Sequence, residues 1–139
     1  MIKEATKAIM DVYNLTLGLK NGTPPDSYSL MGLQAELVKY HTLLGLEMAQ
    51  KFGAKESCYL KRKIAQAQNY QHSRSEKKTS ADSERDAQLS VGEEYQREID
   101  SMTEFEQYRQ LLKSLQNSLD YSRSVLSFIK ASESSPATQ

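Results

Sequence analysis

Apolar residues recur at alternating intervals of three and four along three stretches of the chain, the spacing of a stripe on one side of an α-helix. The first stretch covers residues 3–20 and ends before Gly22 and Pro24, which are typical of a helix end. The second covers about residues 27–74 and the third about residues 84–131. Strict alternation, the mark of a strand, is absent from the sequence. The pattern predicts an all-α fold.

The second stretch contains a point of weakness. Asp26 or Ser27 can cap its first turn, but Gly53 costs a helix about 1 kcal/mol relative to alanine. The sequence leaves three outcomes open at residues 51–54: a kink, a break or a continuous helix.

The third stretch carries two stripes. The first consists of Val91, Tyr95, Ile99 (or Glu98), Met102 and Phe105. The second is a cleaner heptad, which we expect to form a hairpin seam or an oligomer seam; it contains Leu112, Leu115, Leu119, Leu126 and Ile129.

The polar residues 71–83 separate the second and third stretches, so we place a chain reversal there. The expected architecture is a long antiparallel helical hairpin, coiled-coil-like, preceded by a shorter N-terminal helix. Residues 1–131 form a single domain on this interpretation, and residues 132–139 form a disordered tail.

Charge changes sign across the expected reversal. Residues 55–78 hold seven Lys or Arg and two acids, a net of +5, whereas residues 82–106 hold two Arg and nine acids, a net of −7. Antiparallel packing about residue 80 would bring residues 61–63 close to residues 97–100. Three interpretations stay open: pairing within one chain, pairing between protomers of a homo-oligomer, or an exposed basic tip that binds phosphates.

The basic tip has a composition typical of single-stranded nucleic-acid binding, because cations suit the backbone and rings suit base stacking. Tyr59 and Tyr70 are interspersed among the cations, although both also fit the apolar stripe. The candidate nucleic-acid-binding residues are Lys61, Arg62, Lys63, Arg74, Lys77 and Lys78.

Composition narrows the class of protein. The 139 residues carry zero formal net charge, no Trp, three Phe and a single cysteine, Cys58. We expect no disulfide within the chain, a reducing cytoplasmic setting, no signal peptide and no membrane span. His41 and His72 are far apart in sequence, and no nucleotide-binding, hydrolase or metalloprotease motif occurs. We therefore expect no catalytic residue, metal or cofactor.

The order of elements resembles small phage-encoded helical proteins, in particular the phage recombination mediator family. The resemblance covers about residues 55–131: a basic helix ending in tyrosine (KRKIAQAQNY, residues 61–70), a polar Ser/Lys loop, an acidic stretch, and a last helix over residues 108–130. It implies an oligomer of helical hairpins in the host cytoplasm. Its expected partners are single-stranded DNA, a recombinase and a single-strand-binding protein, with DNA contacted by the six basic residues.

Two hypotheses for function follow. The first is a non-enzymatic accessory protein of DNA recombination or replication, which binds single-stranded DNA through the basic tip and oligomerises through the heptad seams. The alternative is a structural or adaptor coiled-coil protein of a virion or regulatory complex, without nucleic-acid binding.

Overall fold

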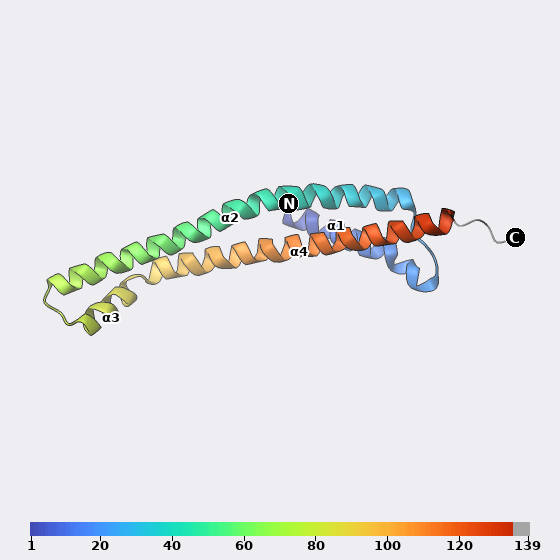
Figure 1. The fold of residues 1–139 in the computed structure, drawn as a ribbon. Helices are drawn as coiled ribbons and strands as arrows, with labels where there is room; N and C mark the ends of the chain where they lie inside the picture. Colours follow the sequence, from blue (N-terminus) through green and yellow to red (C-terminus); the bar gives the residue numbers. More distant parts are fainter. Residues whose placement is uncertain (135–139) are drawn as a thin grey trace. The chain divides into compact units, whose positions relative to one another are not determined.

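The computed structural model describes residues 1–134 and confirms an all-α fold, with no strand among these residues (Figure 1). Its elements are α1 (Ile2–Thr16), the 3-10 helix η1 (Leu17–Asn21), α2 (Ser27–Ser75), α3 (Ser80–Ser90) and α4 (Gly92–Ser134). The contacts group these elements into two compact units. Unit 1 comprises Met1–Leu46 with the chain from residue 108 on, and unit 2 comprises Glu47–Gln107. That residues 1–131 form a single domain stays a prediction.

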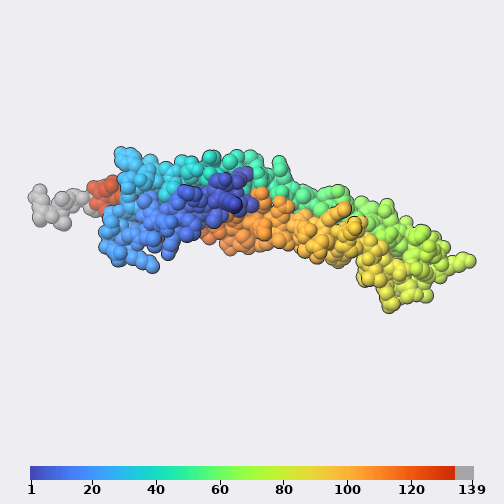
Figure 2. Space-filling model, turned by 180° about the vertical axis from the view of Figure 1, so that it is seen from behind, coloured from blue at the N-terminus to red at the C-terminus, as the bar shows by residue number. Residues whose placement is uncertain are grey.

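Unit 1 contains three helical layers: α1, the first part of α2 and the last part of α4. Figure 2 shows α1, in blue, lying in front of the boundary between the other two segments. A partly buried hydrogen bond of 3.0 Å, from the Gln34 amide to the Ser122 hydroxyl, joins the α2 segment to the α4 segment. The core is formed by side chains spaced as the sequence predicted: Ala5, Ala8, Val12, Leu30, Leu37, Leu44, Leu115, Leu119, Leu126 and Ile129.

The heptad seam of α4 therefore lies inside unit 1. Four of its five residues are buried, and Leu112 is half-buried. Apolar burial of this kind stabilises a fold by about 25 cal/mol per Å² removed from water.

Unit 2 is an antiparallel hairpin. Residue numbers increase along α2 as those of the partners decrease along the returning half of the hairpin. The pairs are Lys51 with Glu104, Arg62 with Glu98, and Ser73 with Asp86. Its apolar core is thin, because Ala87 and Val91 are the only apolar residues of the unit that are buried.

The first helix ends earlier than expected. Residues 3–20 were expected to be α-helical throughout, but α1 stops at Thr16 and continues as η1. The Thr16 hydroxyl donates to the carbonyls of Val12 and Tyr13, at 2.9 and 3.1 Å, and such bonds compete with a regular helix. Gly22 ends η1 with a φ of +75°, the left-handed cap that the sequence predicted.

The second helix is continuous. Asp26 caps it by accepting a hydrogen bond of 2.9 Å from the amide of Ser29, and α2 passes through Gly53 without a break. Its length reflects packing more than propensity, because most helical stability in proteins comes from a packed face.

The reversal is shorter than expected and the third helix is split. The expected loop over residues 71–83 is reduced to residues 76–79, where Lys77 has a φ of +65° and Thr79 caps α3 by accepting from the amide of Asp82. The helix expected over residues 84–131 is two helices, because fully buried Val91 adopts a non-helical conformation between α3 and α4.

The last helix extends beyond its expected end. Ser132 was expected to start a disordered segment, but α4 extends to Ser134, and the Ser132 hydroxyl donates to the carbonyl of Phe128 as part of the last turns. Residues 135–139 of the expected tail lie outside the described residues. Within residues 1–134 no helix combines the length and apolar character needed to cross a membrane.

Candidate functional site

The six basic candidates lie on the C-terminal part of α2 and on the loop that follows, but they do not converge. Lys61 and Lys63 are both exposed. Residues two apart in a helix are separated by about 200° around the axis, so these two side chains point in opposite directions. A single continuous phosphate track along α2 cannot use both of them.

Arg62 is committed to the interior of the hairpin. Its exposure is 7%, and its guanidinium forms an ion pair with the buried Glu98 carboxylate through Nε, with Nη2 3.4 Å from Oε1. The guanidinium carbon lies 4.3 Å from the Tyr95 ring centroid and 5.4 Å from that of Tyr59. The bond to Glu98 raises the pKa of Arg62 further above its ordinary value. Arg62 thus joins α2 to α4 and is withheld from solvent.

Lys78, which lies just before the first turn of α3, forms ion pairs. Its ammonium lies 2.7 Å from the Asp86 carboxylate and 3.9 Å from that of Glu76. Asp86 also accepts a hydrogen bond of 2.9 Å from the Ser73 hydroxyl. Hydrogen bonds from Lys78 and Ser73 favour the ionised form of Asp86 and so hold its pKa below the ordinary value. In turn, Asp86 raises the pKa of Lys78.

Three of the remaining candidates keep their charge available to solvent. Lys63, Arg74 and Lys77 are exposed and form no ion pair with a described residue. Arg74 donates instead to the carbonyl of Lys78, at 3.1 Å. Lys63 and Arg74 are eleven residues apart, three helical turns, so they share a side of α2 with Tyr70 between them. Lys61, on the other side, is similarly unpaired among residues 1–134.

An acid lies next to this strip. A surface hollow is lined by Lys63, Gln66, Tyr70 and Ala87 together with Glu84 of α3. A carboxylate beside the candidate cations weakens their attraction for a phosphate, because both signs of charge then act on it.

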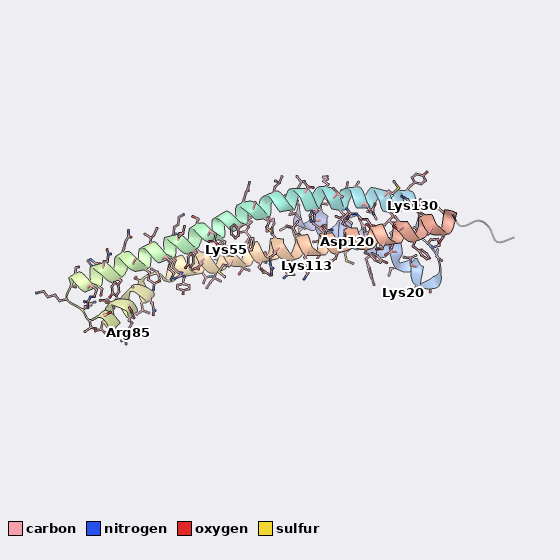
Figure 3. The ribbon with its side chains drawn as sticks, viewed as in Figure 1. Lys20, Lys55, Arg85, Lys113, Asp120 and Lys130 are labelled. Atoms are coloured by element: carbon pink, nitrogen blue, oxygen red, sulfur yellow. The ribbon has the colours of Figure 1, made fainter. Side chains whose placement is uncertain are left out.

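The expected pairing of the charge blocks within one chain is present. Residues 61–63 were expected close to residues 97–100, and Arg62 pairs with Glu98. Lys51 pairs with Glu104 at 2.6 Å farther along the hairpin. Lys55, labelled in Figure 3, extends from α2 to the Phe105 ring of α4, with Nζ 4.8 Å from the centroid.

The structure also identifies a surface that sequence reasoning assigned to the seam. Glu98 takes the inner position, so the neighbouring apolar side chains of α4 turn outward and are nearly half exposed: Tyr95, Ile99 and Met102. The spacing of four and three between them was visible in the sequence. The sequence left Ile99 and Glu98 open as alternatives for the inward position, and Glu98 takes it.

The other titratable candidates are dispersed. Cys58 and His41 are half-buried, and His72 is exposed with its ring 3.2 Å from Glu76. In the described part of the chain, no three His, Cys, Asp or Glu side chains cluster so as to hold a metal ion.

Comparison with known proteins adds no relative: the chain matches no protein-family model, no curated protein and no solved structure. The resemblance to the phage recombination mediator family therefore stays a prediction, and the function has to be argued from the geometry.

Proposed function

We propose that this protein is a non-enzymatic helical adaptor that self-associates and works through the outer faces of its helices. The observation that carries the proposal is the distribution of side chains in unit 2. Some of its charged residues, such as Arg62 and Glu98, join the two halves of the hairpin, while large apolar residues such as Tyr95 and Met102 are nearly half exposed. Contiguous apolar surface on a protein commonly marks an interaction site.

The ionisable residues support binding over catalysis. Arg62, Lys78 and Asp86 have shifted pKa values in unit 2, and each shift follows from a pairing that connects helices or closes the turn. A catalytic group needs a perturbed pKa in a cleft beside a reacting atom. Arg62 pairs with Glu98 instead, and Lys78 and Asp86 pair with each other.

Sedimentation equilibrium or light scattering tests the proposal over about a hundredfold range of concentration. Self-association by mass action predicts that the average mass rises with concentration. A mass equal to one chain at every concentration would contradict the proposal.

A second candidate is the DNA-recombination accessory role, in which the basic tip binds single-stranded DNA and a recombinase and a single-strand-binding protein are partners. Lys63, Tyr70 and Arg74 favour it, because they lie on one strip of α2 with the exposed Lys77 beyond them. Cations that follow a backbone and a ring that stacks on bases are the parts such a surface needs.

Fluorescence anisotropy with a single-stranded oligonucleotide tests this second candidate. Lys63→Glu combined with Arg74→Glu should weaken binding and flatten its salt dependence, by about 0.7 in the logarithmic slope per lost phosphate contact. The charge-matched control is Lys113→Glu combined with Lys130→Glu on α4, both labelled in Figure 3. Equal losses in both double variants, or no binding by the unaltered protein at low salt, would rule out the basic tip.

A further inference from the structure

We propose that one face of unit 2 docks against the same face of a second copy, so that two hairpins form an antiparallel four-helix bundle. This inference rests on the proposed function and names its partner and surface. The face, called the ring face below, consists of Phe52 and Tyr59 from α2 and Tyr95, Ile99 and Met102 from α4.

The residues of the ring face are neighbours. Tyr59 and Met102 line one hollow of about 290 Å³ between α2 and α4. Tyr95 is joined to Tyr59 through Arg62, whose guanidinium contacts both rings. Ile99 lies between Tyr95 and Met102 on the same side of α4, because intervals of four and three keep side chains on one side.

Phe52 extends the face toward the other end of the unit. Its ring packs on Phe105 of α4, with centroids 5.7 Å apart and planes inclined at 57°. A second hollow, lined by Phe105 and Met102 with Lys55, continues the surface from Phe105 to Met102. The ring face is therefore continuous across both helices of the hairpin.

The exposed apolar area of the ring face is a substantial part of what a dimer interface needs. The five side chains are between 41% and 49% exposed. Because an aromatic side chain buries 150–250 Å², the three half-exposed rings alone offer roughly 300 Å² per copy. A standard interface buries about 800 Å² per partner, so the rings supply more than a third of one side. At the ring face, unit 2 is a two-helix layer of α2 and α4, and pairing two such layers gives a four-helix bundle in which both gain a core.

Charge at the edge of the face indicates that the partner is a second copy. Glu56 and Lys63 are seven residues apart on α2, so they flank the ring face on the same side of that helix. When two copies of α2 pack antiparallel with the two-fold axis between residues 59 and 60, each Glu56 faces the partner's Lys63. A two-fold axis makes this pair twice, as an isologous interface requires.

Both residues are available for that pair. Glu56 is exposed, and its nearest cation is Lys55, at 3.9 Å. Lys63 is exposed, and its ammonium lies 5.7 Å from the Tyr59 ring centroid, without an acid in contact among the described residues.

A charge swap tests the interface, with dimer dissociation constants measured by sedimentation equilibrium. Lys63→Glu and Glu56→Lys should each weaken self-association about three- to tenfold, because two attractive edge pairs become repulsive. The double variant, with both substitutions, should return to within about twofold of the unaltered protein. Restoration is specific to a pair formed between copies, since each single change is otherwise independent of the other.

A second set of variants tests the ring face itself. Met102→Asp and Ile99→Asp should weaken self-association more than about tenfold, because a carboxylate must then be buried in an apolar interface. Leu89→Asp is the matched control: Leu89 is 76% exposed on α3, outside the ring face, and its replacement should leave the dissociation constant unchanged. Circular dichroism verifies that each variant keeps its helices.

The outcomes separate this inference from the proposed function. Self-association that persists unchanged in Met102→Asp and in both single charge variants overturns the ring face but leaves a self-associating adaptor. Single variants that weaken association without rescue in the double variant overturn the antiparallel arrangement. A monomer at every concentration overturns both the ring-face dimer and the self-associating adaptor. If that monomer binds an oligonucleotide, and Glu56→Lys strengthens the binding, the ring face is assigned to base stacking instead.

Discussion

Two serines show how much the environment of one buried hydroxyl matters in this protein. Ser83 in α3 and Ser122 in α4 are both completely buried. The Ser122 hydroxyl accepts a hydrogen bond from Gln34 and donates to the carbonyl of Leu119, at 2.8 Å. The Ser83 hydroxyl has no hydrogen-bond partner among the described residues. A buried polar group without a partner costs about 1–3 kcal/mol.

Replacing each serine with alanine should therefore have opposite effects. Ser83→Ala should stabilise the protein by about 1 kcal/mol, because it removes an unsatisfied polar atom. Ser122→Ala should destabilise it by about 1 kcal/mol, because it removes the hydrogen bond between Gln34 of α2 and Ser122 of α4. Both positions are helical, so the gain in helix propensity is the same in both variants. Urea unfolding measures the difference, and equal shifts would contradict it.

Asp86 should make the turn between α2 and α3 sensitive to acid. Its folded-state pKa is lowered by Lys78 and Ser73. The contribution of Asp86 to folding stability is therefore fully present above its unfolded pKa of about 3.9 and is lost as pH falls through the folded value. Lys78 has a raised pKa, so its contribution is present below about pH 10.4 and is lost as pH rises through the folded value. The pair should hold the turn between these limits.

The carboxylate signal of Asp86, followed by NMR as a function of pH, measures this coupling directly. Lys78→Met should raise the pKa of Asp86, since it removes the largest cause of the depression. Lys113→Met, on α4 in unit 1, removes the same charge elsewhere and should leave Asp86 unchanged. An Asp86 titration that is identical in both variants would show that Lys78 is not its partner in solution.

At the scale of elements, two glycines have opposite roles. Gly53 lies inside α2, and a Cβ built on it meets no atom within 4 Å. Gly22 ends η1 with a φ of +75°, which L-residues rarely adopt. Gly53→Ala should stabilise the protein by about 1 kcal/mol through helix propensity, whereas Gly22→Ala should destabilise it by about 1 kcal/mol through backbone strain. Thermal unfolding of the two variants distinguishes a continuous α2 from a helix that is broken at residue 53.

The sequence predicted the elements well where apolar residues recur at regular intervals or where a residue such as Gly22 favours one backbone conformation. The heptad of α4, the end at Gly22 and the opposition of residues 61–63 to residues 97–100 all follow from spacing or charge. The polar residues 71–83 were misassigned because polarity alone does not exclude a helix. Thr79 followed by Asp82 at the third helical position was the capping signal that located the start of α3.

The break at Val91 and the outward turn of the ring face were not available from the sequence. Both depend on which side of α4 meets α2, and tertiary packing sets that choice. Glu98 takes the inner position opposite Arg62, with which it forms an ion pair. A pattern that counts apolar residues favours Ile99 there, so the candidate surface was hidden inside the expected seam.

At the scale of the whole chain, the two units differ in how they are held together. Unit 1 buries Leu30, Leu37, Leu44 and Leu115 completely. In unit 2 the buried set is mainly polar, with Arg62, Ser73, Ser83 and Glu98 alongside Ala87 and Val91. Buried polar pairs fix the register of the helices more than they add net stability, because the desolvation cost of burying a charge offsets much of the attraction within the pair. Unit 2 should therefore open at a lower free energy than unit 1.

Hydrogen exchange followed by mass spectrometry tests this difference, because amide protection reports the free energy of local opening. In dilute solution, amides of residues 51–70 and 92–105 should exchange faster than those of residues 30–44 and 115–129. If the ring face docks on a second copy, raising the concentration should slow exchange in unit 2 selectively, since association stabilises only the segments it buries. Met102→Asp should abolish that concentration dependence and leave exchange in unit 1 unchanged. Uniform protection across both units in dilute solution would mean that the hairpin is stable as a two-helix layer, and that its outward rings are not needed to complete a core.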